Sequence, residues 1–316
     1  MAEVPQRQAY GMALAEYGDV NPDVVVLDAD VSSSTLTKYF ADRHPSRFFN
    51  LGVTEASMVN VGVGLALSGR IPFVNTFAAL LTLRACEQIR TCVAYANANV
   101  KLIGGYAGLS DYKDGPTHFA INDVALMRAM PNVVVIAPAD NIEAARMVRA
   151  IAEHEGPVYM RISRAAVPDV FGPDHQVHIG KGIMLRSGND VTIIGSGSMM
   201  GRCVRAADQL VAEGVSVRLL NIHTLKPLDV DLICQAAEET GALVTAEDHS
   251  VIGGLGGAVA EALGRCCPAV LEYVGLQDTF AGTGLDTESL MDAWGLAVQD
   301  IVNAARRAME RKARRR

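Results

Sequence analysis

The sequence predicts an α/β protein of two domains, the first built on a parallel sheet with helices on both faces. Short β-branched runs alternate with segments whose apolar residues recur at helical spacing, which is typical of that architecture. The chain has 316 residues, 50% hydrophobic and 20% charged, which is enough to bury two cores. An aperiodic stretch rich in Pro, Gly, Asp and His at 167–181 separates two such regions. We therefore expect domains at 1–170 and 186–316, with a linker at 171–185.

The first domain is expected to open with a helix at 7–17 that Gly18 ends, followed by a buried strand at 23–29. The strand is a continuous apolar run of the kind found in parallel sheets. A hydroxyl-rich turn at 30–35 follows it, at the carboxyl end of the sheet where ligands collect. Helix capping would explain only one or two of these polar residues. Further strands are expected at 71–76, 100–104, 133–137 and 157–162, and further helices at 56–68, 80–95, 122–128 and 142–154.

The second, smaller domain repeats the alternation of strands and helices. Its turn at 195–200 lacks the third glycine of a dinucleotide fingerprint, so we interpret it as a tight strand-to-helix turn. The glycines at 253–257 lack the Lys-Ser/Thr of a phosphate loop and are expected to allow close helix packing. We expect this domain to be structural and to stabilise a dimer. Its strands are predicted at 190–194, 217–221, 243–247 and 270–274, and its helices at 202–213, 229–240 and 253–263.

Composition excludes several classes of function. A formal net charge of −7 and a pI near 5.5 argue against a nucleic-acid partner, because phosphate backbones bind clustered Lys and Arg. The basic run at 306–316 is interpreted as a solvated or frayed tail. No leader-like segment precedes Val4 and no apolar run of membrane-spanning length occurs, so we expect a cytoplasmic protein without membrane contact.

The cysteines show no chemical pattern. They stand at 86, 92, 203, 234, 266 and 267, without the spacing of a zinc site or a redox pair. Buried, reduced thiols are therefore expected, because free cysteine packs as a small hydrophobe. We predict no metal ligands in this chain.

One carboxylate stands out, Glu55 in the stretch 51–58 (LGVTEASM). It precedes a helix that carries no other ionisable group through Leu67, so it is expected at the helix start in apolar surroundings. An acid so placed suits a hydrogen bond to a ring nitrogen. The alternative is a glutamate that merely favours the positive end of the helix dipole.

Four stretches of the first domain stand in the order LGVTEASM, VNTFAALLTLRACEQIR, DGPTH and PNVVVIAPAD. Together they resemble the pyrimidine-binding half of a thiamine diphosphate enzyme of the transketolase family, and the similarity continues to the C-terminus. The resemblance implies an α/β pyrimidine-binding domain followed by a transketolase C-terminal domain. The family's diphosphate and metal motif, Gly-Asp-Gly followed by Asn, is not found. We therefore expect the C-terminal subunit of a split transketolase, with thiamine diphosphate and Mg²⁺ held mainly by an N-terminal partner subunit in an α2β2 heterotetramer.

The resemblance implies roles for four residues toward the cofactor. Glu55 would contact the aminopyrimidine and help to activate the cofactor, which makes it catalytic as well as cofactor-binding. Phe77 would stack on the pyrimidine, with Asp30 and Leu80 beside it. Family members often carry further aromatic residues where this chain has Leu80 and Leu83, so a more aliphatic pocket is expected.

Substrate contacts are also implied by the resemblance. His118 ends a long glycine-bearing loop at 104–118, in the motif 114–118 (DGPTH). It would be catalytic and would contact substrate oxygens, because an imidazole can exchange protons with a sugar hydroxyl. Asp114 would contact a substrate hydroxyl. The remaining contacts suggest a phosphorylated sugar, because one guanidinium group can donate two parallel hydrogen bonds to the oxygens of a phosphate. These substrate-binding residues are Arg164, Arg7, Ser34 and Tyr106.

Two departures from the family pattern affect the substrate. Tyr106 stands where many transketolases have His, and Tyr112-Lys113 replaces the usual Gly-Glu. A specialised sugar is therefore expected, although the sequence does not indicate which one. The predicted reaction is transfer of a two-carbon ketol unit from a phosphorylated ketose to an aldose.

Three alternatives remain open from the sequence. The first keeps the fold and changes the reaction: the beta subunit of a 2-oxoacid dehydrogenase first component, or a deoxyxylulose-phosphate synthase-like enzyme. The second is a non-catalytic scaffold or regulatory subunit. A dinucleotide-binding oxidoreductase is the third.

Overall fold

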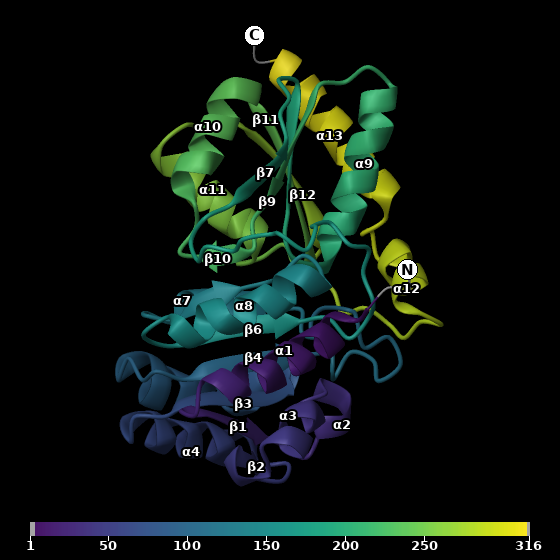
Figure 1. Ribbon diagram of the computed structural model, residues 1–316. Coiled ribbons are helices and arrows are strands. Elements are labelled where there is room, and N and C mark those ends of the chain that lie inside the picture. Colours follow the sequence, from purple (N-terminus) through teal and green to yellow (C-terminus); the bar gives the residue numbers. More distant parts are fainter. Residues whose placement is uncertain (1–3, 315–316) are drawn as a thin grey trace.

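The computed structural model describes residues 4–314 and shows two α/β units stacked one above the other (Figure 1). The first contains a seven-stranded sheet in the order β10-β5-β6-β4-β3-β1-β2. All of its neighbouring strands are parallel except β10, which pairs antiparallel with β5. The strands are β1 (Val24–Asp28), β2 (Phe48–Asn50), β3 (Ile71–Phe77), β4 (Lys101–Gly105), β5 (Val134–Ile136), β6 (Val158–Ile162) and β10 (Thr224–Lys226).

Helices cover both faces of this sheet. Along β1, Val24 and Val26 pack with α1, α3 and α8, whereas Val25 and Leu27 pack with α4, α5 and α7. Side chains of a strand alternate between faces, so both faces are buried and the strand is apolar throughout. The α/β fold class is thus confirmed. The helices are α1 (Gln6–Val20), α2 (Ser32–Thr35), α3 (Lys38–Arg43), η1 (Pro45–Arg47), α4 (Glu55–Leu67), α5 (Ala78–Arg84), α6 (Cys86–Gln88), η2 (Ile89–Tyr95), α7 (Asp123–Ala129) and α8 (Asn141–Glu153).

The second unit has a five-stranded sheet in the order β12-β11-β8-β9-β7, in which only β7 runs antiparallel to its neighbour. Glycines allow its elements to pack closely: a Cβ on Gly256 would lie 2.4 Å from the Tyr273 ring. Strand β7 starts inside the predicted linker. The elements are β7 (Ile183–Arg186), β8 (Val191–Gly195), η3 (Gly197–Met199), α9 (Met200–Ala212), β9 (Val217–Asn221), α10 (Val230–Thr240), β11 (Ala242–Ser250), α11 (Leu255–Arg265), β12 (Val270–Leu276), α12 (Thr287–Ala293) and α13 (Val298–Ala313).

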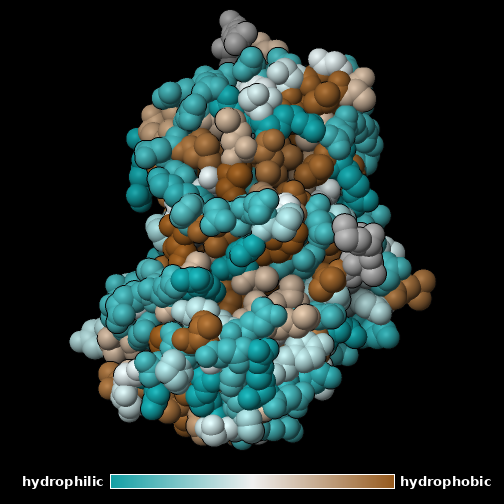
Figure 2. Space-filling model, in the orientation of Figure 1, coloured by the Kyte–Doolittle hydropathy of each residue, from teal (hydrophilic) through white to brown (hydrophobic). Residues whose placement is uncertain are grey.

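Figure 2 shows the surface on the side seen in Figure 1. Apolar side chains gather on the second unit between α10 and α9, where β7 crosses the view, and Met184 of β7 is exposed there. Within residues 4–314, none of the helices combines the length and the apolar character needed to cross a bilayer.

Two sequence expectations about local structure are confirmed only in part. The arginines of 306–313 are exposed, as expected, but the segment is not a frayed tail. The region 306–313 belongs to α13, whose apolar face is buried against the second sheet, and residues 315–316 lie outside the described part. Its basic residues are held by acids of the second unit: Arg306 pairs with Glu213, and Arg307 and Arg311 pair with Glu272. The helix expected at 80–95 is divided into α5, α6 and the π-helical η2.

The expectation of reduced thiols is wrong for one pair of cysteines. Cys234 of α10 and Cys266 at the end of α11 form a disulfide. The two helices pack side by side, which brings together cysteines 32 positions apart in the sequence. Cys203, in contrast, is a buried thiol, and burial raises its pKa to about 12.

Candidate active site

The predicted substrate residues come together at the carboxyl edge of the first sheet. Phe77 ends β3, Tyr106 follows β4 directly and Arg164 lies two positions after β6. Because β6, β4, β3 and β1 are neighbours in the sheet, their carboxyl ends lie side by side. Ser34, in α2 after β1, and Arg7, in α1, complete the group. We call Arg7, Ser34, Phe77, Tyr106 and Arg164 the arginine–aromatic cluster.

Tyr106 is the centre of this cluster. Its ring stacks on the Phe77 ring with centroids 4.4 Å apart. The His118 ring lies edge-on to the Phe77 ring, with centroids 6.2 Å apart. Tyr106 has a φ of 60°, a conformation that costs a non-glycine residue free energy and that gathers at functional sites. The tyrosine that departs from the family pattern therefore organises the site.

Two guanidinium groups lie over the same tyrosine ring. The guanidinium carbon of Arg7 is 5.6 Å from the Tyr106 ring centroid, and that of Arg164 is 5.1 Å from it. Arg7 Nη1 also donates hydrogen bonds to the Ser34 carbonyl oxygen at 2.8 Å and to the Tyr106 hydroxyl at 3.2 Å. Ser34 thus contacts Arg7 through its backbone, a contact that side-chain chemistry does not reveal.

The hydroxyls that follow Ser34 have a structural role. Thr35 and Thr37 both donate to Asp28 Oδ2, at 2.9 and 2.8 Å. Burial nevertheless raises the pKa of the Asp28 carboxyl. The turn expected at 30–35 is largely the short helix α2, and part of its polarity serves to satisfy this buried acid.

Asp111, the acid that binds Arg164, is a site residue that no sequence motif indicates. Its Oδ1 lies 2.9 Å from Arg164 Nη1, and its side chain is fully buried. The pKa of Asp111 is raised to about 7. Burial away from water is the largest cause, and the neighbouring Asp114 is the next. Asp111 lies in the long loop 104–118 that the sequence does indicate, but nothing in the sequence shows which acid of that loop turns inward.

The second domain packs against the loop 104–118 and fixes its position. Gly108 has a φ of +61°, and a Cβ there would lie 2.0 Å from Asp248 Oδ2 of β11. Asp248 Oδ1 lies 2.9 Å from Arg161 Nη1 of β6. The end of the loop is more open, since Asp114 is exposed and His118 is half-buried, with Nδ1 3.0 Å from the Thr117 hydroxyl.

Glu55 is the first residue of α4, and its side chain is only 4% exposed. Its Oε1 accepts a hydrogen bond of 3.0 Å from Arg84 Nη1, while Oε2 accepts none from residues 4–314. Arg84 ends α5, and no motif in the sequence indicates this pairing. A buried carboxylate with one oxygen available is what a hydrogen bond to a ring nitrogen requires.

The other predicted cofactor residues lie on the same edge of the sheet. Asp30, with a φ of 64°, follows β1, and its Oδ1 accepts a hydrogen bond of 2.7 Å from Asn50 at the end of β2. Phe77 and Leu80 are half-buried. The half-buried ring and the buried carboxylate of Glu55 suit a flat heteroaromatic group. Among residues 4–314, no three His, Cys, Asp or Glu side chains lie close enough together to hold a metal ion.

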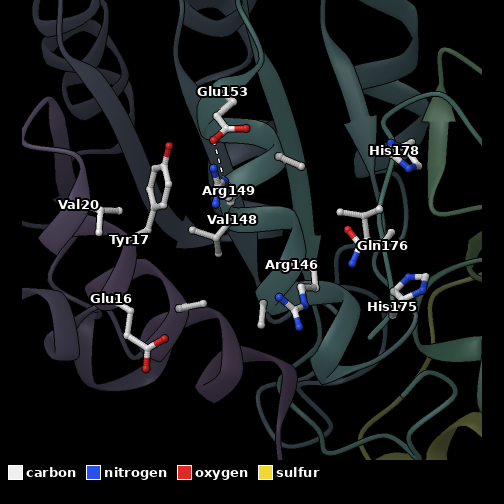
Figure 3. Close-up of a pocket in the computed structure, with 14 residues that line it drawn as sticks. Glu16, Tyr17, Val20, Arg146, Val148, Arg149, Glu153, His175, Gln176 and His178 are labelled. Carbon is white, nitrogen blue, oxygen red and sulfur yellow. Dashed lines mark hydrogen bonds and ion pairs between the residues drawn. The ribbon is translucent and has the colours of Figure 1, made fainter. Parts of the chain in front are cut away.

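A cavity of about 610 Å³ lies elsewhere, between α1, α8 and the segment 175–178 (Figure 3). Its walls include Tyr17, Arg146 and His175, and Arg149 pairs there with Glu153. None of the site residues predicted from the sequence lines it. The cavity is therefore separate from the candidate active site.

Comparison with known families defines the class of protein. Residues 2–170 match the model of the transketolase pyrimidine binding domain, and residues 180–301 match that of the transketolase C-terminal domain. A buried acid with one available oxygen and a half-buried aromatic ring after β3 fit an enzyme that binds thiamine diphosphate. The chain belongs to the transketolase family, and the resemblance seen in its sequence is confirmed.

The chain matches three relatives over most of their length. The chain is 40% identical over 306 residues to the 6-deoxy-6-sulfo-D-fructose transketolase subunit of Clostridium sp. (strain MSTE9), a match that covers 97% of this chain and 95% of that protein. It is 34% identical over 295 residues to one subunit of the apulose-4-phosphate transketolase of Phocaeicola vulgatus, a match that covers 90% of this chain and 94% of that protein. A solved split-gene transketolase, an inactive β4 tetramer, superimposes with a TM-score of 0.90 at 44% identity, covering 98% and 100%. These relatives are transketolase subunits of the same extent as this chain.

Proposed function

We propose that this chain is the C-terminal subunit of a thiamine diphosphate-dependent transketolase that moves a two-carbon ketol unit from a ketose to an aldose. Glu55 carries this proposal, because its buried carboxylate keeps one oxygen available at the carboxyl edge of the sheet. Relatives of the same extent that are named as subunits support a second chain, which would hold the diphosphate and Mg²⁺.

The surface beside Glu55 suits such a partner. Helix α4 has no ionisable residue after Glu55, so its exposed positions are all uncharged, in contrast to the charged surface usual for a solvent-facing helix. Val61 and Leu67 are 40% and 76% exposed. Loss of charged residues marks the core of protein–protein interfaces. The exposed positions are Ser57, Asn60, Val61, Gly64 and Leu67. We propose that the N-terminal subunit covers this face in an α2β2 assembly.

The residues of this chain divide the chemistry between them. Thiamine diphosphate, when bound, supplies the carbon nucleophile that adds to a ketose carbonyl. Glu55 would hold the pyrimidine through a hydrogen bond to its ring nitrogen, and Phe77 would contact the ring face. His118 would exchange a proton with a substrate hydroxyl beside the bond that breaks. The two guanidinium groups over Tyr106 would orient the far end of the sugar.

The first prediction is that activity depends on the partner. The purified chain alone should show no ketol transfer, and the chain mixed with the N-terminal subunit should show it, measured as aldehyde released from a panel of ketoses. The N-terminal subunit alone is the control. Ketol transfer by this chain alone would contradict the proposal.

Two rival functions are separated by the same preparation. Decarboxylation of pyruvate without cleavage of any ketose would favour a 2-oxoacid dehydrogenase component or a deoxyxylulose-phosphate synthase. An unchanged rate in a complex that carries Glu55→Ala would favour a non-catalytic scaffold. The transketolase names of the relatives favour ketol transfer over both.

A further inference from the structure

We propose that Asp111 sets the charge of the accepted substrate: the site takes a sugar whose far end bears a single negative charge, such as a sulfonate, in preference to a phosphate dianion. This inference rests on the proposed function and specifies its substrate class. It replaces the expectation of a phosphate, which rested on three matched polar positions, Arg164, Arg7 and Ser34.

Arg164 is already balanced by an acid. Its Nη1 lies 2.9 Å from Asp111 Oδ1, and Asp111 is fully buried whereas Arg164 is 26% exposed. An incoming phosphate could not displace Asp111 into water, because breaking a buried ion pair leaves an uncompensated charge. Above the pKa of about 7 of Asp111, the pair therefore carries no net charge, while Arg164 keeps hydrogen-bond donors for a ligand.

Arg7 provides the remaining positive charge. It makes no ion pair with residues 4–314, and its hydrogen bonds go to two neutral acceptors, the Ser34 carbonyl and the Tyr106 hydroxyl. Its Nε is buried without a hydrogen-bond partner in the described part of the chain. A buried guanidinium nitrogen without an acceptor suits an anionic oxygen.

The charges around the cluster therefore sum to about one positive unit above the pKa of Asp111. Arg164 and Asp111 cancel, and Lys113 and Asp114 are both exposed and carry opposite charges. Arg7 is left uncompensated. A sulfonate offers three acceptor oxygens with one charge, whereas a phosphate monoester with a second pKa near 6 carries close to two charges above neutral pH. The second charge would lie near Asp111 with no cation to balance it.

The direct test measures binding of two probes of similar size that differ by one charge. Methanesulfonate and methyl phosphate are titrated at pH 8 into the assembled complex, above the pKa of about 7 of Asp111. Methanesulfonate should bind about tenfold more tightly, because the second negative charge of methyl phosphate would lie near the ionised Asp111 without a cation to balance it. Asp111→Asn should shift this preference about tenfold toward methyl phosphate. Glu16→Gln, which removes one exposed acid elsewhere in α1, is the matched control and should change neither affinity.

Arg7→Gln provides a second test that does not depend on the buried acid. It should abolish binding of both anions while the far-UV circular dichroism stays unchanged. The inference is overturned if methyl phosphate binds the wild-type complex at least as well as methanesulfonate. It is also overturned if Asp111→Asn alters both affinities by the same factor, or if Arg7→Gln still binds them.

A kinetic test separates this inference from the proposed function. The complex is assayed with one ketose that ends in CH₂OH, in a sulfonate or in a phosphate. The wild-type kcat/KM should be highest for the sulfonate, and Asp111→Asn should raise the value for the phosphate relative to the sulfonate about tenfold. Cleavage of none of the three sugars would contradict the proposed function, and the probe titrations would still decide on the anion. Preference for the phosphate would overturn the inference alone.

Discussion

The carboxyl edges of the two sheets differ in how their acids are used. In the first sheet, Glu55 keeps one carboxylate oxygen to which no residue of 4–314 donates a hydrogen bond. In the second sheet, Glu247 accepts hydrogen bonds from the Leu255 and Gly256 amides that begin α11, and Asp248 binds Arg161 and the Ser198 hydroxyl. Both edges are polar and follow parallel strands. Of these three acids, only Glu55 has a carboxylate oxygen that accepts no hydrogen bond from residues 4–314, and a spare acceptor of this kind is what a ligand donor requires.

This comparison also revises the role expected of the second domain. Asp248 and Gly108 are in such close contact that the glycine has no room for a side chain. The second domain therefore positions the loop that carries Asp111, Asp114 and His118, in addition to any part in dimerisation. Asp248 of the second domain acts on the site by packing against Gly108 and by its ion pair with Arg161.

The largest effect is expected for Glu55→Gln. The amide keeps the shape of the side chain and loses its acid, so kcat of the assembled complex should fall about a thousandfold, within the range usual for general acid–base catalysis. Thermal stability of the chain should change little, since Arg84 is half-exposed and pairs of this kind contribute little. A loss of stability with kcat retained would mean that Glu55 is a structural acid like Glu247.

Asp248→Ala should show the opposite behaviour, because its main effect is expected on stability. It leaves Arg161 buried with one acid fewer, which is expected to lower the free energy of unfolding by about 3–5 kcal/mol in urea denaturation. Asp174→Ala, which removes an exposed aspartate of the linker, is the control and should stay within about 0.5 kcal/mol. Equal effects of the two substitutions would show that the second edge is not structural.

A smaller effect concerns the pH dependence of stability at Asp111. Its raised pKa of about 7 means that the folded chain holds this proton at pH values where the unfolded chain has released it. Its contribution to stability is therefore largest at low pH and is lost progressively as the pH rises from about 4 to about 7. Asp111→Asn should remove this slope, so the Tm of the variant minus that of the wild type should increase between pH 5 and pH 8. A constant difference would show that Asp111 is ionised in the folded chain throughout this range.

Patterns along the chain predict the fold and much of the site. Periodicity indicates the strands, and the rule that ligands bind at carboxyl ends of parallel strands places Phe77, Tyr106 and Arg164 together. The contacts that complete the site depend on how loops and helix ends turn. Neither Arg84 beside Glu55 nor Asp111 beside Arg164 is predictable from spacing. The first pair joins residues 29 positions apart, and the second joins residues 53 positions apart. The disulfide and the full extent of α13 are equally hard to predict, because packing of one helix against another element decides them.

Strand β10 has a consequence for how this enzyme can be divided. The second domain contributes this strand to the edge of the first sheet, where Thr224 pairs with Ile136 and Lys226 with Val135. A chain cut between its two domains would leave β5 with an open row of backbone donors and acceptors, which promotes aggregation. The shared strand therefore makes the boundary between these two domains an unsuitable place to divide the chain.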